Sequence, residues 1–359
     1  MLTADVEVDR RDFTVHASLT VAAGERVALF GPSGAGKTTV LETIAGLVWP
    51  RRGLVELGGR VLTSTGSPAV EVPPWQRRVG LLRQDPGLFP HLPVRGNLLY
   101  ARSAAGAELT TIARQLGIDE LLPVMPARLS GGQRHRVALG RLLLAHCDAL
   151  LLDEPFASLD ETLRRALTVL VKDLSSEREV PSVLVTHQLS DAQAFADRLL
   201  VMDQGSVLQA GAPDEVVLRP ASRRVAELVG YLGFVPAAAD DGGHGSVGSP
   251  AGSGTAESGT AGSAGTGAGV VAGVHPDRVM PGADPSRGLV VTGTVEAARP
   301  SGAGWEADLR AGDASFTCRL PDRPDSAQVS VTLLDPPLFA PDGSLIPAAA
   351  GVSPPARSG

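Results

Sequence analysis

The sequence is poor in lysine, cysteine, aromatic residues and long apolar runs. Two of its 359 residues are lysines, Lys37 and Lys172, and every other basic residue is an arginine. The two cysteines, Cys147 and Cys318, fall in what look like different domains, which argues against a disulfide framework and favours a reducing, intracellular compartment. No apolar run approaches the roughly 18 residues of a membrane span, and no basic segment followed by an apolar one opens the chain. We expect such a protein to reach a membrane only through a partner.

Length and composition predict two domains joined by a flexible segment. The apolar content of 43% is enough to bury two cores, and the net charge of −7 argues against a general nucleic-acid binder, which is usually basic. Between residues 236 and 269, 11 of 34 residues are glycine and 5 are serine, so this stretch has little to bury. We expect a first domain at 1–233 with a helical subdomain at about 85–146, a flexible linker at 234–269, a small all-β module at 270–345 and a loose tail at 346–359.

The stretch from Gly31 to Thr39 matches the phosphate-loop pattern G-x-x-x-x-G-K-[ST]. An apolar strand over 26–30 precedes it, and a helix over 38–45 follows. Glycines let backbone N–H groups turn inward around phosphate oxygens at a helix N-terminus. Lys37 would place a compact positive charge at the β- and γ-phosphates of ATP, and the Thr38 hydroxyl would bind Mg²⁺. The residues expected to hold the nucleotide are Gly31, Pro32, Ser33, Gly34, Ala35, Gly36, Lys37, Thr38 and Thr39.

Strands and helices alternate over the rest of the first domain. Apolar strands are predicted at 79–82, 149–153 and 182–186, and the helices around and between them predict a parallel sheet with helical crossovers. Short strands before residue 22 and a hairpin turn at Gly58-Gly59 predict an antiparallel edge. Further helices are predicted at 94–102, 108–116, 131–145, 162–175, 189–196, 213–218 and 222–229. The predicted fold is therefore an α/β P-loop NTPase with a mixed sheet, an antiparallel β edge and a helical subdomain.

Two carboxylates stand at the end of a buried strand, at Asp153 and Glu154. Asp153 would accept hydrogen bonds from the water shell of Mg²⁺, and Glu154 would orient and deprotonate the attacking water. A surface turn is the alternative for this pair alone, but a phosphate loop in the same sheet favours the catalytic interpretation.

A second anion-accepting helix terminus is predicted at Ser130, Gly131, Gly132 and Gln133. Ser130 is a typical N-cap, and the glycines leave the first N–H groups of the following helix uncovered. Two phosphate-accepting helix ends for one nucleotide suggest that the protein assembles in pairs.

Over about residues 1–233 the chain resembles the ATP-binding subunit of ABC transporters. The resemblance rests on the phosphate loop, Gln84, 129–133, 150–155, 158–160 and His187, in this order. It implies a head-to-tail homodimer with two ATP molecules, each held between the phosphate loop of one copy and Ser130, Gly131 and Gln133 of the other. It further implies that the dimer lies on the cytoplasmic face of the cell membrane, under two permease subunits. An extracytoplasmic binding protein would deliver the substrate to these permease subunits.

The same resemblance implies roles for three further residues. Gln84 would contact the γ-phosphate, Mg²⁺ and the attacking water, and would couple the site to the membrane subunit. His187 would contact the γ-phosphate and Glu154, and Asp160 would lie at the dimer interface. Without the resemblance, Gln84 is an ordinary loop glutamine and His187 an ordinary hydrogen-bonded histidine.

The sequence departs from the family pattern at two places. The family usually stacks adenine on an aromatic residue of the first strands, but the window from Val6 to Arg11 has none, and Phe13 is the nearest ring. An aliphatic or arginine surface could take over that contact. Arg83 precedes Gln84, where an aromatic residue is common in the family.

Residues 73–80 and 88–98 resemble the molybdate-importer ATPases most closely. The β-module resembles the transport-associated OB-like domain of importers for molybdate, sulfate, iron and polyamines, in which it binds oxyanions or regulates the ATPase. We therefore expect an ATPase that drives molybdate or tungstate import, with sulfate, iron or polyamine import as alternatives. Two other classes are an ABC ATPase that acts on DNA or ribosomes, against which the missing coiled coils and basic stripe argue, and an oxyanion sensor built on the β-module.

Overall fold

The computed structural model describes residues 1–100, 106–156, 159–237, 270–302 and 304–346. Most of the expected linker at 234–269 and of the tail at 346–359 lies outside these ranges, as does Ser158. The described residues form two compact units, Met1–Val216 and Val217 onward, which are taken here one at a time. None of the described helices is long and apolar enough to cross a bilayer.

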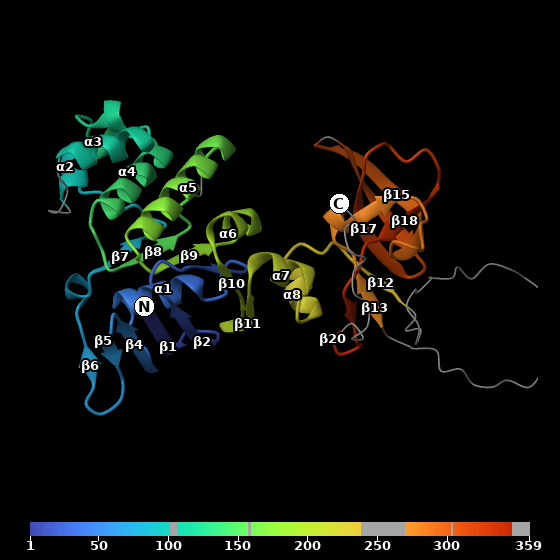
Figure 1. The fold of residues 1–359 in the computed structure, drawn as a ribbon, viewed down its shortest axis with the longest axis horizontal. Coiled ribbons are helices and arrows are strands. Elements are labelled where there is room, and N and C mark those ends of the chain that lie inside the picture. The colour runs from blue at the N-terminus through green and yellow to red at the C-terminus, as the bar shows by residue number, and fades with distance from the viewer. Residues whose placement is uncertain (101–105, 157–158, 238–269, 303, 347–359) are drawn as a thin grey trace, which may run out of the picture. The chain divides into compact units, whose positions relative to one another are not determined.

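The first unit is built on a mixed sheet of eleven described strands (Figure 1). Strands β10, β3, β9, β8 and β7 are parallel neighbours, while β1, β2, β4, β5 and β6 form the expected antiparallel edge. In spatial order the strands are β6 (Val70–Glu71), β5 (Arg60–Ser64), β4 (Arg52–Leu57), β1 (Leu2–Asp9), β2 (Thr14–Val21), β11 (Ser206–Gly211), β10 (Arg198–Asp203), β3 (Arg26–Phe30), β9 (Ser182–Thr186), β8 (Ala149–Asp153) and β7 (Val79–Leu82). The predicted α/β P-loop fold with an antiparallel edge is confirmed.

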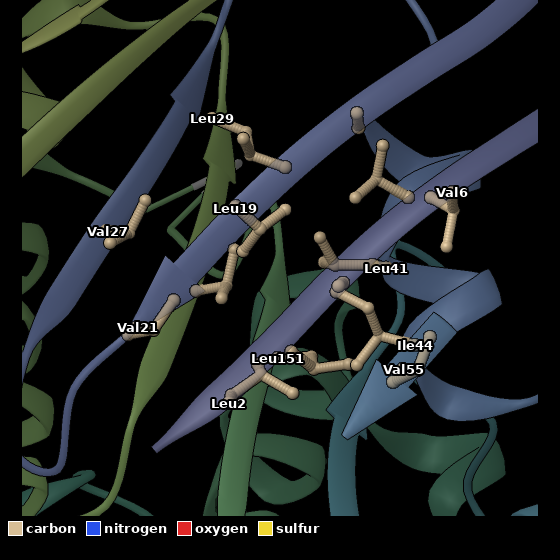
Figure 2. Packing of buried hydrophobic residues seen from close by; sticks show 14 of the residues in the cluster. Leu2, Val6, Leu19, Val21, Val27, Leu29, Leu41, Ile44, Val55 and Leu151 are labelled. Carbon is tan, nitrogen blue, oxygen red and sulfur yellow. The ribbon is translucent and has the colours of Figure 1, made fainter. Parts of the chain in front are cut away.

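The core of this unit lies between the antiparallel edge and the helix that follows the phosphate loop, α1 (Lys37–Ala45). Every second residue of β1 and β2 is buried, because alternate side chains of a strand point to opposite faces. Figure 2 shows Leu2, Val6 and Leu19 from these strands gathered around Leu41 and Ile44 of α1. This packing fixes the helix at whose N-terminus the phosphate loop lies.

The buried Arg77 side chain contacts the C-terminal end of α1. The Arg77 side chain donates to Ile44 O at 2.9 Å, to Val72 O at 2.7 Å and to Thr63 Oγ1 at 2.9 Å. Burial lowers the pKa of this guanidinium, and Glu71 opposes the shift. A positive charge is favourable at the carbonyl end of a helix. Gly46 is required here, since a Cβ on it would lie 2.3 Å from Arg77 Nε.

We expect Arg77→Met to lower the free energy of unfolding by at least about 3 kcal/mol, because it leaves three buried acceptors without a donor. For a domain of this size that corresponds to a fall in melting temperature of about 6–12 °C. Arg78→Met is the matched control, since the Arg78–Asp148 ion pair is exposed and should contribute about 1 kcal/mol or less. Thermal unfolding of both variants checks this, and an equal effect of the two would contradict it.

The helices of the first unit form two groups. Figure 1 shows α2 (Val94–Leu99), α3 (Gly106–Gln115) and α4 (Gly131–Leu143) together beyond β7, as expected for the helical subdomain. The second group, α5 (Glu161–Glu177) and α6 (Leu189–Phe195), connects the parallel strands, and α7 (Pro213–Leu218) spans the end of the unit. Of the helix expected at 94–102, the part after residue 100 lies outside the described residues.

The second unit begins earlier than the expected boundary at residue 233. Helix α8 (Arg223–Leu228) joins it because Arg223 N–H donates to Gly343 O and Ser222 forms a bridge with Ser344. Residues 234–236, expected to begin the linker, form a strand that pairs with 271–273. The described strands form two antiparallel sheets. The first sheet contains β12 (Phe234–Pro236), β13 (Val271–Gly273), β19 (Leu338–Phe339) and β20 (Leu345–Ile346). The second sheet contains, in spatial order, β14 (Val279–Pro281), β18 (Gln328–Leu333), β15 (Leu289–Ser301), β16 (Gly304–Ala311) and β17 (Ala314–Leu320). An all-β region is therefore present after residue 270, as predicted, and α8 precedes it.

Candidate functional site

Four neighbouring parallel strands carry predicted site residues at or just after their ends. The phosphate loop follows β3, His187 follows β9, Asp153 and Glu154 lie at the end of β8, and Gln84 follows β7. Phe30 of β3 lies opposite Thr186 of β9, and Val185 of β9 lies opposite Asp153 of β8. Leu82 of β7 lies opposite Leu152 of β8. Because parallel strands end at the same edge, the residues that follow them meet there, and this edge is where ligands bind in open α/β sheets.

The phosphate loop takes a backbone shape that favours glycine at three positions, Gly31, Gly34 and Gly36. Gly36 has φ +99° and caps α1, and a Cβ on Gly31 would lie 1.9 Å from Met202 O. The first helical hydrogen bond runs from Val40 N–H to Gly36 O. The N–H groups of Lys37, Thr38 and Thr39 therefore precede the helical ladder and are directed at the loop, as anion binding requires.

Lys37 is the buried cation of the site. Its ammonium donates to Gly31 O at 2.9 Å and to Pro32 O at 2.8 Å, and the residue is 6% exposed. Burial lowers the pKa of this ammonium, and the carboxylates of Glu154 and Asp153 oppose the shift. The lysine is therefore held by the loop backbone, near enough to two acidic groups for them to raise its pKa.

Thr38 and Asp153 join the loop to the neighbouring strand end. Thr38 Oγ1 donates to Asp153 Oδ2 at 2.9 Å, and Asp153 is 5% exposed. Burial raises the pKa of Asp153, and the hydrogen bond from Thr38 opposes that shift. A hydroxyl and a carboxylate oxygen in contact are ligands that Mg²⁺ prefers, so these two side chains fit the ion.

The buried Asp153 carboxylate should cost stability when no cation is bound. We expect Asp153→Asn to raise the free energy of unfolding by about 1 kcal/mol in EDTA, because the amide keeps the contact with Thr38 but carries no charge. This corresponds to a rise of about 2–4 °C in melting temperature. Asp173→Asn, on the exposed face of α5, is the control and should change little. A lower melting temperature for Asp153→Asn would contradict the expectation.

Glu154 and His187 form a pair at the adjacent strand ends. His187 Nδ1 lies 2.9 Å from Glu154 Oε1, and the Glu154 side chain is 19% exposed. Glu154 takes a left-handed conformation, φ +49°, which is costly for a residue with a side chain. Its N–H donates to Val185 O, which holds that conformation in place. The carboxylate is thus fixed and partly open to solvent, as a general base must be.

The other predicted residues lie apart from this centre or have a local structural role. Gln84 is exposed and stands two residues beyond β7, at the same edge of the sheet. Ser130 caps α4 in a capping box, accepting from Gln133 N–H and donating its own N–H to Gln133 Oε1 at 2.8 Å. The Asp160 side chain caps α5 by accepting from Leu163 N–H at 3.0 Å. Gly131 and Gly132 form the first turn after the Ser130 cap, as predicted from the sequence.

Besides Arg77, sequence reasoning missed the contacts of two arginines with α1. Arg10 donates to Thr39 Oγ1 at 2.9 Å, and Arg83 donates to Glu42 Oε1 at 3.1 Å. The ion pair with Glu42 gives Arg83 a structural role that an aromatic residue could not fill. The spacing between these partners, 29 and 41 residues, carries no sequence signal.

The fold and this edge define a P-loop nucleotide-binding protein, and the comparisons narrow the class. Residues 15–157 match the family model described as ABC transporter. The thiamine import ATP-binding protein ThiQ of Salmonella choleraesuis is 41% identical over 212 residues, which is 57% of this chain and 87% of that protein. The chain therefore belongs to the family of ABC transporter ATP-binding proteins.

Two further relatives and one solved structure agree with this assignment. The molybdenum import ATP-binding protein ModC of Mesorhizobium japonicum is 40% identical over 65% of this chain and 64% of its own length. The Fe(3+) ions import ATP-binding protein FbpC of Pseudomonas fluorescens is 41% identical over 63% and 64%. The match thus spans less than two thirds of these two relatives. A dimeric ATP-binding cassette, MJ0796, solved with ADP and Pi, has a TM-score of 0.51 and 26% identity, over 59% of this chain and 99% of that one.

Proposed function

We propose that the chain is the ATP-hydrolysing subunit of an ABC importer and that the imported substrate is molybdate. The observation that carries the ATPase proposal is the convergence of Lys37, the Thr38–Asp153 contact and the Glu154–His187 pair at one sheet edge. A binding module would need the loop and the lysine but not a fixed carboxylate beside them.

The charges of the site favour ATP that arrives with a divalent cation. Lys37 carries one positive charge, whereas Asp153 and Glu154 bring two carboxylates. A bare triphosphate would therefore meet a site of net negative charge, which Mg²⁺ offsets when bound by bridging phosphate oxygens. Thr38 and Asp153 would hold the ion, and Gln84 would join them from the end of β7.

Glu154 is the proposed general base. It accepts the proton of the water that attacks the γ-phosphate, while His187 donates from Nδ1 to its Oε1 and fixes the carboxylate, and the other ring nitrogen of His187 would contact the phosphate. The N–H groups of the loop and the Lys37 ammonium stabilise the charge on the phosphate oxygens.

A head-to-tail homodimer would complete each site. The N-terminus of α4, capped by Ser130 and Gln133, is exposed and presents N–H groups that a phosphate of a second copy's nucleotide can accept. Asp160 is exposed as well and follows Glu154 by six residues in the sequence, which suits a residue at the dimer interface.

The permease subunits would dock on the helical subdomain. Phe89, Tyr100 and His91 form an aromatic group there, with 4.1 Å between the ring centroids of Phe89 and Tyr100, and Arg141 lies over the Phe89 ring. Tyr100 is 59% exposed and Leu99 is 37% exposed. Aromatic side chains beside an arginine are typical of protein interfaces. The assembly would lie on the cytoplasmic face of the membrane, served by an extracytoplasmic binding protein.

Molybdate is proposed as the cargo because ModC proteins recur among the relatives, including those of Mycobacterium tuberculosis and Photorhabdus laumondii. The C-terminal β-sheets would then form the transport-associated OB-like module. Iron is the second candidate, favoured by FbpC, with sulfate, polyamine and thiamine import as further alternatives.

Uptake of labelled molybdate by a deletion strain tests the cargo. We expect uptake to be lost on deletion, restored by the full chain and not restored by Lys37→Ala. Normal molybdate uptake with loss of iron or sulfate uptake would overturn the assignment of molybdate while leaving the ATPase proposal intact.

A further inference from the structure

An arginine on α4 holds the segment of chain that follows Gln84. Arg141 Nη2 donates to Pro86 O at 3.1 Å, and Arg141 Nη1 donates to Gly87 O at 3.1 Å. The central carbon of the same guanidinium lies 5.2 Å from the centre of the Phe89 ring. The planar fork of one side chain therefore holds two backbone carbonyl oxygens while its face covers a ring.

The group that makes these contacts is a half-buried charge. Burial lowers the pKa of the Arg141 guanidinium, and Tyr100 opposes the shift. A charge removed from water needs hydrogen-bond partners, and hydrogen bonds from a charged donor are stronger than those between neutral groups. Moving the segment away from α4 would take the carbonyl oxygens of Pro86 and Gly87 from this guanidinium, so the contact resists displacement.

Few backbone torsions separate the held carbonyl groups from Gln84. Strand β7 ends at Leu82, two residues before Gln84. On the other side, the Asp85 carboxylate accepts from Gly87 N–H at 3.3 Å, and the ring of Pro86 fixes its own φ. Gln84 therefore lies between a strand end and a closed turn. Because Gln84 is exposed, the path of this backbone decides where its side chain starts.

The far end of the segment is fixed by a second buried side chain. Asn97 of α2 accepts from Phe89 N–H at 2.8 Å and donates to Phe89 O at 3.2 Å and to Leu92 O at 2.9 Å. Helices α2 and α4 pack against each other. The segment after Gln84 is thus held by two helices of the helical subdomain, and Arg141 is the anchor on the side of Gln84.

We propose that Arg141 is a positioning residue for ATP hydrolysis: it fixes the backbone after Gln84 so that the Gln84 side chain reaches the metal and the attacking water. The inference rests on the proposed function, since it requires Gln84 to serve that site. Arg141 touches no nucleotide and acts through Gln84. Loss of its fork should therefore lower turnover without weakening nucleotide binding, because the phosphate loop follows β3 and not β7.

Steady-state ATPase assays and Mg²⁺-ADP titration calorimetry on the full chain test this. Arg141→Lys keeps the charge, but an ammonium cannot hold two carbonyl oxygens and cover a ring as a planar fork does. We expect kcat to fall about 10-fold, because a small displacement of a positioned group lowers the rate strongly. KM for Mg²⁺-ATP and the affinity for Mg²⁺-ADP should stay within about twofold of the wild type.

Arg136→Lys is the matched control on the same helix. Arg136 Nη1 donates to Leu116 O at 2.8 Å and to Gly117 O at 3.0 Å, so it also holds backbone carbonyl oxygens, in a loop without a predicted site residue. Both variants should lower the melting temperature by similar amounts, but Arg136→Lys should keep the wild-type kcat. An equal fall of kcat in the two variants would make Arg141 a purely structural residue and overturn the proposal.

A double-mutant cycle shows whether Arg141 acts through Gln84. In a Gln84→Ala chain, Arg141→Lys should lower kcat no further, because no side chain is left to position. Asp85→Ala opens the exposed turn without removing a buried group, so it serves if Arg141→Lys folds poorly. Its smaller fall in kcat should likewise be absent in the Gln84→Ala chain.

Three results would overturn the positioning proposal in an active wild-type chain. They are additive losses of kcat in the cycle, normal turnover in Gln84→Ala alone, and weaker Mg²⁺-ADP binding with normal kcat in Arg141→Lys. A wild-type chain that hydrolyses no ATP would instead refute the proposed function, and this proposal with it.

Discussion

The Glu154→Gln variant is expected to bind ATP but to hydrolyse it at least about 10² times more slowly than the wild type. Glutamine keeps the size of the side chain and a polar contact with His187, but it cannot accept a proton from water. ATP would then persist between two copies of the chain. Size-exclusion chromatography with light scattering should show an ATP-dependent dimer for the variant, and a steady-state phosphate assay should show the lost turnover.

Two further variants sharpen this test. Glu177→Gln lies on the exposed surface near the end of α5 and should behave as the wild type. Adding Ser130→Asn to Glu154→Gln preserves a good N-cap for α4 but changes the group offered to a second copy's nucleotide, so the trapped dimer should be lost without loss of fold. Normal hydrolysis by Glu154→Gln would rule Glu154 out as the base.

The Lys37→Ala variant is expected to lose nucleotide affinity by about 10²-fold or more. Lys37 is the buried cation of the loop, and removing one partner of a buried charge contact typically costs about 2–5 kcal/mol. The sequence offers a direct control, because its one other lysine, Lys172, lies on α5 and donates to Ala194 O. Lys172→Ala should bind Mg²⁺-ATP normally in titration calorimetry.

Lys37→Arg should fail almost as completely as Lys37→Ala. The ammonium reaches the carbonyl oxygens of Gly31 and Pro32 as a compact donor, and a planar fork cannot take the same position. Full affinity in Lys37→Arg would mean that only the charge matters at this position. Full affinity in Lys37→Ala would exclude the loop as the phosphate site.

The sequence predicts the parallel half of the fold well because its strands are uninterrupted apolar runs. Strands β8 and β9 have the predicted bounds, 149–153 and 182–186, and the fold class and the family resemblance are confirmed. Segments whose hydrogen-bond partners lie far along the chain are harder to assign to a domain from the sequence. The run at 222–236 looks like the end of the first domain by periodicity alone, but its hydrogen bonds go to strands near residues 273 and 343.

In the candidate site, too, residues with local sequence signals could be predicted, and contacts between distant segments could not. A motif such as the phosphate loop carries its own geometry, because glycine positions and a lysine at fixed spacing are local properties. The contacts of Arg10 with Thr39 and of Arg77 with Ile44 depend on how β1, β7 and α1 pack together, and nothing near either arginine in the sequence names its partner. The roles of Gln84, Ser130 and Asp160 depend on partner subunits and stay predictions.

The hydrogen bond from Arg77 to Ile44 O restrains the C-terminal end of α1. At its C-terminus the helix is held by Arg77, two residues ahead of β7, and at its N-terminus it would be held by a phosphate bound in the loop. A rod fixed at both ends transmits displacement instead of absorbing it. If a triphosphate binds in the loop as proposed, we expect a small shift there to be passed through α1 and Arg77 toward β7 and Gln84.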